Sequence, residues 1–585
     1  MEQDHGAIAL AAGAPPRRWK FGLGIRPEVA ILCVVVAAPL AFPLLLIVQS
    51  AFNVGDPEDI PATQFGFDHI IEVADHLDWI GHTLAVSAGG TILATLIGVV
   101  LAWILHRTTV PGSRLFEILV TVPYPLGPLV GALAWNTLGS PQGGLINKIL
   151  SAVTGLSGPF IDTSSMAGII FVMAIFEAPV AVLMIGAAMQ RMDPSLEECS
   201  SVMGAPTLRT ALRITLPLML PAILSAALFL FTSMMGSFAI PAILGANSRF
   251  YVVTTAIFIL FQGYPPNYPL ASALGILLIL ITALAVLLYS RALRGRSYVV
   301  VSGKSYRPRR INMRGWTPLL FGFEILYILV ALVLPLGVLI IASLQTSSVL
   351  SLSPANWTLQ NFKYVIVDFP TTRTAIENSL MLGVGTGTIG MVLAAVLALV
   401  VHRSGGRGIG LLEQLIMLPQ SFPRLIFGFG FLWMVLILPG HLYGTLIPVL
   451  LGYVVAFMPL AYRSMAGVVV QLDASLAEAA RLYGAGRIRA AWTITVPLLR
   501  GGLLVTWTLL FMVSIGEVSA SIFLAGSGTQ VLGPAILNFW ESGGLPHVSA
   551  LVVTQSLIVL LAMVLVRKVG GGRNDGETAV PKGTP

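Results

Sequence analysis

Long apolar segments separated by short polar ones run through almost the whole chain. A helix needs about 20 apolar residues to cross the roughly 30 Å hydrocarbon core of a bilayer, and twelve segments meet that length. The pattern therefore predicts an all-α polytopic membrane protein. The expected spans lie near residues 29–52, 83–105, 117–138, 167–190, 216–244, 269–290, 317–344, 379–401, 412–436, 445–468, 497–524 and 548–566.

One polar stretch between these segments occurs twice, 280 residues apart. Residues 193–204 read DPSLEECSSVMG, and residues 473–484 read DASLAEAARLYG. The aspartate that opens each copy is expected to cap a short helix. The glycine that closes it, Gly204 or Gly484, is expected to end that helix in the left-handed conformation. The repeat predicts two short polar helices lying against the membrane.

The two halves also correspond outside this stretch. HTLAVSAGGT from His82 matches NSLMLGVGTG from Asn378, at a spacing of 296 rather than 280 residues. The first half therefore has about sixteen extra residues, which we place in the loop 139–163. Such self-similarity predicts a fused duplication. The expected parts are a tail at 1–28, a first six-span domain at 29–290, a linker at 291–316, a second domain at 317–567 and a tail at 568–585.

The basic residues predict the orientation of the chain. The loop 53–81 has seven acidic residues and no lysine or arginine, whereas the linker 291–316 has eight basic residues and no acidic one. Loops rich in lysine and arginine stay in the cytoplasm. Both tails and both copies of the repeat are therefore expected to be cytoplasmic. The net charge of +7 follows from this topology and does not indicate nucleic-acid binding.

The low share of charged residues supports a membrane protein, and the motifs argue against an enzyme. Only 10% of the residues are charged, against about 25% in soluble proteins. The two cysteines, Cys33 and Cys199, provide no disulfide framework or metal-site spacing. Gly303, Lys304 and Ser305 resemble the end of a phosphate-binding loop, but Tyr298 stands where that loop needs a glycine. We expect no active site, no nucleotide site and no cofactor, and no metal ligands can be assigned.

Two acidic residues are candidates for a transport pathway. Glu177 lies near the middle of the fourth predicted span and Glu517 in the eleventh. An acid inside a span is costly and normally faces a bundle interior or a water-filled path. The alternative for both is a structural hydrogen bond to a neighbouring helix. Arg424 either faces a cavity or reaches the interface. Proline clusters near Pro123 and Pro419 remove helical hydrogen bonds, which membrane helices tolerate beside a cavity.

The repeated stretch resembles the EAA loop of ABC importer permeases. The second copy has the Glu-Ala-Ala triplet and the glycine six residues after the glutamate, whereas the first keeps the glutamate and glycine but has Cys199 and Ser200 in place of the alanines. The fused layout resembles the type I (MetI-like) permease fold. The resemblance implies that the residues coupling the chain to an ATPase are Glu198, Gly204, Glu478, Ala479, Ala480 and Gly484.

The resemblance also implies partners and a location. These are a dimer of cytoplasmic ATP-binding subunits, a periplasmic substrate-binding protein and the lipid of a bacterial inner membrane. The segments 302–316 and 356–365 look most like those of ferric-iron permeases, and thiamine, 2-aminoethylphosphonate and polyamines are the alternative substrates. A 12-span secondary transporter is the rival class, but the loop HRTTVPGSR lacks the Asp-Arg-x-Gly-Arg-Arg pattern of the major facilitator family.

Overall fold

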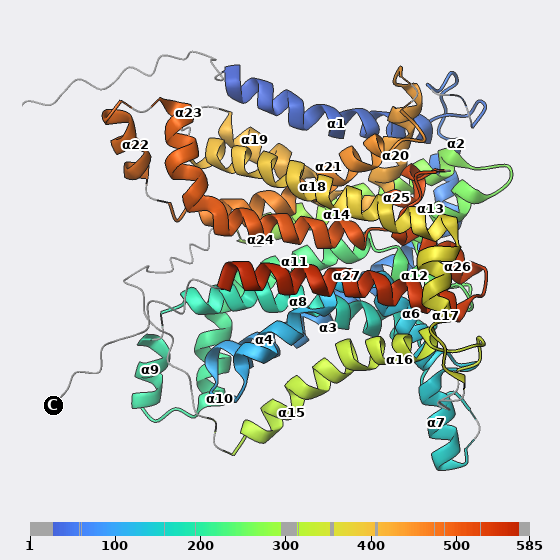
Figure 1. Cartoon of the computed structure of the whole chain (residues 1–585), viewed down its shortest axis with the longest axis horizontal. Helices are drawn as coiled ribbons and strands as arrows, with labels where there is room; N and C mark the ends of the chain where they lie inside the picture. The colour runs from blue at the N-terminus through green and yellow to red at the C-terminus, as the bar shows by residue number, and fades with distance from the viewer. Residues whose placement is uncertain are drawn as a thin grey trace, which may run out of the picture.

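A computed structural model describes residues 27–293, 313 and 315–571, except positions 58, 60, 157, 194, 351–355, 404–407, 441, 473, 485 and 527. Most of both predicted tails and most of the linker, including Gly303, Lys304 and Ser305, lie outside the described residues. The described part is helical, and the β-structure recorded in it consists of two isolated bridges. The predicted all-α fold is confirmed (Figure 1).

Ten segments in the described part are long and apolar enough to cross a membrane as continuous helices. They agree with ten of the twelve predicted spans. Several carry a short π-helical turn at one end or in the middle. The helices are α1 (Pro27–Ala51), α3 (Leu77–Arg107), α8 (Met166–Arg191), α11 (Leu216–Met235), α14 (Tyr268–Leu293), α15 and α16 (Thr317–Ile328 and Leu334–Ser343), α18 (Pro370–Arg403), α21 (Leu446–Val469), α24 (Val496–Ile515) and α27 (Leu545–Gly571).

The third and ninth predicted spans, 117–138 and 412–436, are broken rather than straight. In the first half, α4 (Ser113–Thr121) and α5 (Pro123–Leu126) meet α6 (Pro128–Gly139) at 94°. In the second half, α19 (Ile409–Met417) and the 3-10 turn Leu418–Ser421 meet α20 (Arg424–Ile437) at 102°. Proline has no N–H to donate to a helix, and Gly127, at the first bend, has a φ of +92°, which a Cβ would disfavour.

The fifth and eleventh spans are shorter than predicted. The apolar runs 216–244 and 497–524 continue past the ends of α11 and α24, but the chain turns at Gly236 and Gly516. The remainders form the short helices α12 (Ala239–Leu244) and α25 (Ser521–Leu524). Glu517 therefore lies in the turn between α24 and α25, and its predicted place within a span is wrong.

The short polar helices gather at one end of the bundle (Figure 1). That end holds α9 (Ser195–Val202), α10 (Thr207–Thr210), α22 (Ala474–Leu482) and α23 (Arg487–Ala490), together with the start of α1 and the end of α27. The opposite end holds α2 (Asp68–Glu72), α7 (Leu145–Thr154), α13 (Val253–Gln262), α17 (Gln360–Lys363) and α26 (Leu532–Glu541). Helix α7 falls inside the predicted insertion 139–163, and the described residues of the matching connection 438–445 form no helix.

The first span of each half packs against the broken span of the other half. Helix α1 lies along α19 and α20, and α15 and α16 lie against α4 and α6 (Figure 1). Tyr327 of α15 donates its hydroxyl to the Ile175 carbonyl of α8 at 2.8 Å, so this contact includes a hydrogen bond between the halves. Each half therefore covers the broken span of its partner.

Candidate functional site

Four chain breaks meet where the two halves touch. A Cβ added at Gly127 would lie 3.9 Å from the Cα of Gly516, and one added at Gly236 would lie 3.0 Å from the Cα of Pro423. Each contact joins a broken span of one half to the end of a long helix in the other half. The two contacts correspond through the sequence repeat, because Gly127 matches Pro423 and Gly236 matches Gly516. The same contact therefore occurs twice at the centre of the molecule.

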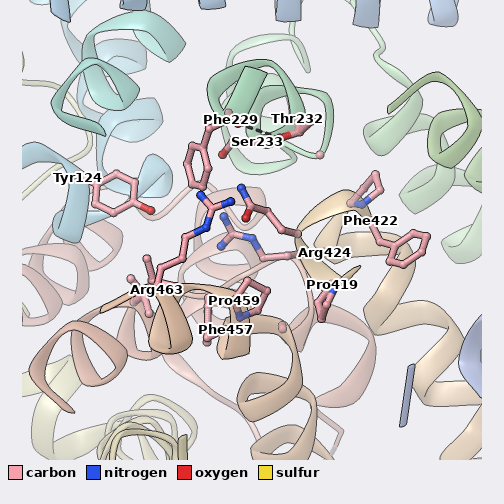
Figure 2. Close-up of a pocket in the computed structure, with 16 residues that line it drawn as sticks. Tyr124, Phe229, Thr232, Ser233, Pro419, Phe422, Arg424, Phe457, Pro459 and Arg463 are labelled. Atoms are coloured by element: carbon pink, nitrogen blue, oxygen red, sulfur yellow. Dashed lines mark hydrogen bonds between the residues drawn. The ribbon is translucent and has the colours of Figure 1, made fainter. Parts of the chain in front are cut away.

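A cavity of about 100 Å³ lies beside these breaks. Tyr124 and Ser233 of the first half and Arg424 and Arg463 of the second half are among its lining residues, and both guanidinium groups point into it (Figure 2). A smaller cavity of about 50 Å³ adjoins it and is lined by Tyr124, Arg424 and both predicted pathway acids, including Glu177. The structure thus brings Glu177 and Glu517 together at one place between the halves.

Glu517 is held by its own half. Its Oε2 lies 2.9 Å from Nη1 of Arg424, and its Oε1 accepts a hydrogen bond from the backbone N–H of Ala520 at 3.0 Å. The side chain of Glu517 is 3% exposed, whereas that of Arg424 is 43% exposed. The salt bridge fixes the start of α20 to the turn after α24. Arg424 therefore faces the cavity rather than the membrane interface.

One carboxylate oxygen of Glu177 accepts no hydrogen bond from the described residues. Ser233 of α11 donates its hydroxyl to Oε1 of Glu177 at 3.3 Å, while Oε2 is buried without a hydrogen-bond partner among the described residues. Glu177 lies within α8, two residues before Pro179. Of the two predicted pathway acids, Glu177 is the one with an uncommitted oxygen at the cavity. No group of three or more His, Cys, Asp or Glu in the described part is placed to hold a metal ion.

Arg463 was missed by the sequence reasoning. It lies in α21, and its guanidinium carbon is 6.0 Å from the centre of the Phe229 ring of the first half. It makes no ion pair with an acidic residue in the described part of the chain. The available signal was a basic residue inside the predicted span 445–468. Arg463 therefore adds to the larger cavity a positive charge that the two predicted acids did not suggest.

The short helices of the repeat have the predicted ends. The Oδ1 of Asp193 accepts a hydrogen bond from the backbone N–H of Ser195 at 2.9 Å, whereas Asp473 lies outside the described residues. Gly204 and Gly484 have φ of +80° and +88°, which confirms the left-handed ends. The remaining predicted residues whose side chains are described at these helices are exposed or half-buried, namely Glu198, Ala479 and Ala480.

Comparison with known proteins agrees with this architecture. The family model described as "Binding-protein-dependent transport system inner membrane component" matches residues 90–296 and 387–570. The ferric transport system permease protein FbpB of Actinobacillus pleuropneumoniae is 26% identical over 568 residues, covering 93% of this chain and 77% of that protein. The Fe(3+)-transport system permease protein FbpB 2 of Haemophilus influenzae is 23% identical, covering 90% of this chain and 93% of that one.

Among solved structures, a chain of a bacterial ABC transporter that imports alginate aligns with 46% of this chain and 96% of its own length, at 21% identity and a TM-score of 0.40. The two matches to the family model cover both halves, so the rival interpretation as a 12-span secondary transporter is not supported. The chain belongs to the binding-protein-dependent transport system inner membrane components, the permeases of ABC importers, and carries the family domain twice in one polypeptide.

Proposed function

We propose that this permease imports ferric iron across a bacterial inner membrane, with both termini in the cytoplasm. The observation that carries the proposal is the arrangement of the duplicated domains. Each presents a short polar helix at the same end of the bundle, and a charged cavity lies between the two. The relatives named for ferric transport, which extend over most of the chain, support iron as the cargo.

The short helices α9 and α22 are the coupling helices in this proposal. Each occupies a cleft on one of two cytoplasmic ATP-binding subunits, through Glu198 and Gly204 in the first half and through Glu478, Ala479, Ala480 and Gly484 in the second. The chain itself has no complete phosphate-binding loop, so ATP hydrolysis belongs to those subunits. When ATP draws them together, the coupling helices move the long helices and open or close the contacts at the four breaks.

The cavity offers a hard cation one uncommitted acidic oxygen. Ferric iron prefers oxygen ligands, and Oε2 of Glu177 has no hydrogen-bond partner among the described residues. Glu517 is neutralised by Arg424 and serves to hold the bend. A single acidic oxygen binds the cation weakly, which suits a pathway, while tight coordination belongs to a periplasmic binding protein that delivers the iron.

A second cargo class is favoured by Arg463. An arginine at the cavity without an acidic partner in the described part attracts an anion, since guanidinium groups bind phosphonate and carboxylate oxygens well. Of the alternatives left open by the sequence, 2-aminoethylphosphonate has such a group and thiamine and polyamines do not. The anion proposal and the iron proposal place their decisive contacts on different residues.

Uptake by intact cells tests the two cargoes. A strain lacking this permease is expected to take up radioactive iron slowly when iron is scarce, and Glu177→Gln is expected to slow uptake while an ATP-binding subunit still co-purifies with the chain. Arg463→Gln is the matched cavity variant, and under the iron proposal it leaves uptake near the wild-type rate. Normal iron uptake in the deletion strain, with loss of growth on 2-aminoethylphosphonate that Arg463→Gln reproduces, would move the assignment to the anion.

A further inference from the structure

A buried ion pair lies beneath the first coupling helix. Arg107, the last residue of α3, is 0% exposed, and its Nη1 lies 3.5 Å from Oε2 of Glu197 in α9. Its Nη2 donates a hydrogen bond to the carbonyl oxygen of Met189 in α8 at 3.1 Å. The other oxygen of Glu197 accepts a hydrogen bond from Thr215 at 2.5 Å. One charged pair therefore ties α9 to α3, to α8 and to the start of the fifth span.

A second link holds the same helix. The hydroxyls of Ser200 in α9 and Thr210 in α10 are 2.8 Å apart and share a hydrogen bond. Glu197 is 7% exposed, whereas its neighbour Glu198 is exposed. The two adjacent acids thus face opposite ways: Glu198 is available to a partner and Glu197 is committed to the bundle.

The second half lacks three of the groups that make these links. At the positions 280 residues later, Glu197 is replaced by Ala477, Ser200 by Ala480 and Thr210 by Ala490. The residue that corresponds to Arg107 is Arg403, which is exposed and makes no ion pair with an acid in the described part. The side chain of alanine offers no hydrogen bond, so these three positions cannot link the second half in the way that they link the first.

We propose that Arg107 and Glu197 are positioning residues that make the first coupling helix move as one body with the second, fourth and fifth spans, and that α22, with Ala477 in place of Glu197, lacks this ion pair. The proposal rests on the proposed function, in which both helices transmit the motion of ATP-binding subunits. A buried pair is lost at high cost when one partner is removed, but the two can be replaced together by apolar residues of similar size. The double replacement therefore tests whether the ion pair transmits motion without leaving a buried charge that would disrupt folding.

A natural cysteine provides the measurement. Cys199 is exposed on α9, and Ala479 is the equivalent exposed position on α22. In a Cys33→Ser background, a spin label on Cys199 reports the motion of α9 in the purified full-length chain. A Cys33→Ser/Cys199→Ser/Ala479→Cys chain provides the matched label on α22. We expect restricted motion at 199, faster motion at 479, and a label at 199 that becomes as mobile as the one at 479 in Arg107→Met/Glu197→Leu.

Transport gives the second readout, with radioactive iron as the probe, in proteoliposomes that contain the co-purified ATP-binding subunits and are supplied with the iron-loaded substrate-binding protein. Arg107→Met/Glu197→Leu is expected to reach the membrane and keep those subunits, but to import about fivefold less iron per ATP hydrolysed. Glu197→Gln keeps the volume and the bond with Thr215, and is expected to fall in between. It also provides a result if the double variant fails to fold.

The outcomes separate the two proposals. Equal label motion at 199 with and without the ion pair, together with an unchanged ratio of iron to ATP, would overturn the positioning role alone. A wild-type chain that retains no ATP-binding subunit would remove the proposed function and, with it, this role. A label that loosens together with a fall in iron per ATP, in a chain that still binds its ATP-binding subunits, supports both.

Discussion

Arg424 and Glu517 lie 2.9 Å apart and fasten the bend of the ninth span to the turn that ends the eleventh. Both belong to the second half, and the same two residues line the cavity against the first half. The cavity wall on this side is therefore set by a salt bridge, whereas Glu177 on the opposite side is held by one hydrogen bond from Ser233.

Removing one partner of this salt bridge should destabilise the fold. Breaking a fully buried pair costs about 3–5 kcal/mol, and the 43% exposure of the Arg424 side chain reduces the expected loss for Arg424→Met or Glu517→Leu to about 1–3 kcal/mol. The double variant should lose less than the sum of the two, because no charge is left unpaired. Thermal unfolding in detergent measures each. Lys363→Met is the control, since its 3.9 Å pair with Asp368 is exposed; additive losses at 424 and 517 would argue against the interaction.

The contact between Gly236 and Pro423 should not accept a larger side chain. A Cβ at Gly236 would lie 3.0 Å from the Cα of Pro423, so Gly236→Val must push the two halves apart. We expect a lower melting temperature and slower transport. Gly322→Val in α15 is the control, because a Cβ there meets nothing within 4 Å. If both variants behave alike, the effect comes from replacing a glycine with valine and not from the contact between halves.

The end of the second coupling helix depends on a left-handed glycine. Gly484 has a φ of +88° and open space around it, so a substitution there acts through backbone conformation and not through a clash. Gly484→Val should cost about 1–2 kcal/mol locally and weaken co-purification of the ATP-binding subunit, whereas Gly484→Asn should be milder because asparagine tolerates this conformation.

Two comparisons complete the test of coupling. Gly204→Val is expected to be less damaging than Gly484→Val, since the second copy follows the Glu-Ala-Ala pattern more closely. Glu478→Lys reverses a charge on the same helix and should also reduce transport. Unchanged transport in both Glu478→Lys and Gly484→Val would leave the docking proposal without support.

The proposed orientation predicts which cysteines an impermeant reagent can reach. In a chain with Cys33 and Cys199 replaced by serine, a cysteine at the exposed Asp59 should be labelled on intact cells. One at Arg309, in the basic linker, should react only after the cells are permeabilised. The reverse pattern would place the acidic loop in the cytoplasm and both coupling helices outside.

The number and place of most spans were predictable because a bilayer imposes a length of apolar helix that can be counted. The same count could not reveal the bends at Gly127 and Pro423, since a broken helix is as apolar as a straight one. The proline clusters at Pro123 and Pro419 were the available signal, and they were interpreted as weakened hydrogen bonds rather than as corners. For the same reason Glu517 was placed within a span that in fact ends at Ile515.

Within the site, features set by neighbouring residues in the chain could be predicted, whereas contacts between residues far apart in the sequence could not. Helix caps and left-handed glycines at the repeat depend on neighbours within a few residues, so Gly204 and Gly484 could be assigned from the sequence. The pair of Arg107 with Glu197 joins positions that are 90 residues apart, and the bond of Arg424 with Glu517 spans 93. A single sequence contains no signal for such partners.

Helix α7 extends the first half at the end of the bundle opposite α9 and α22, and the described residues of the matching connection in the second half form no helix. Rotating the molecule by half a turn about the axis between its halves therefore does not reproduce this end of the bundle. Any protein that spans both halves from that side meets two unlike contours. Such a protein has one bound orientation of lowest free energy instead of two equivalent ones. It therefore presents its ligand to the charged cavity in a single orientation.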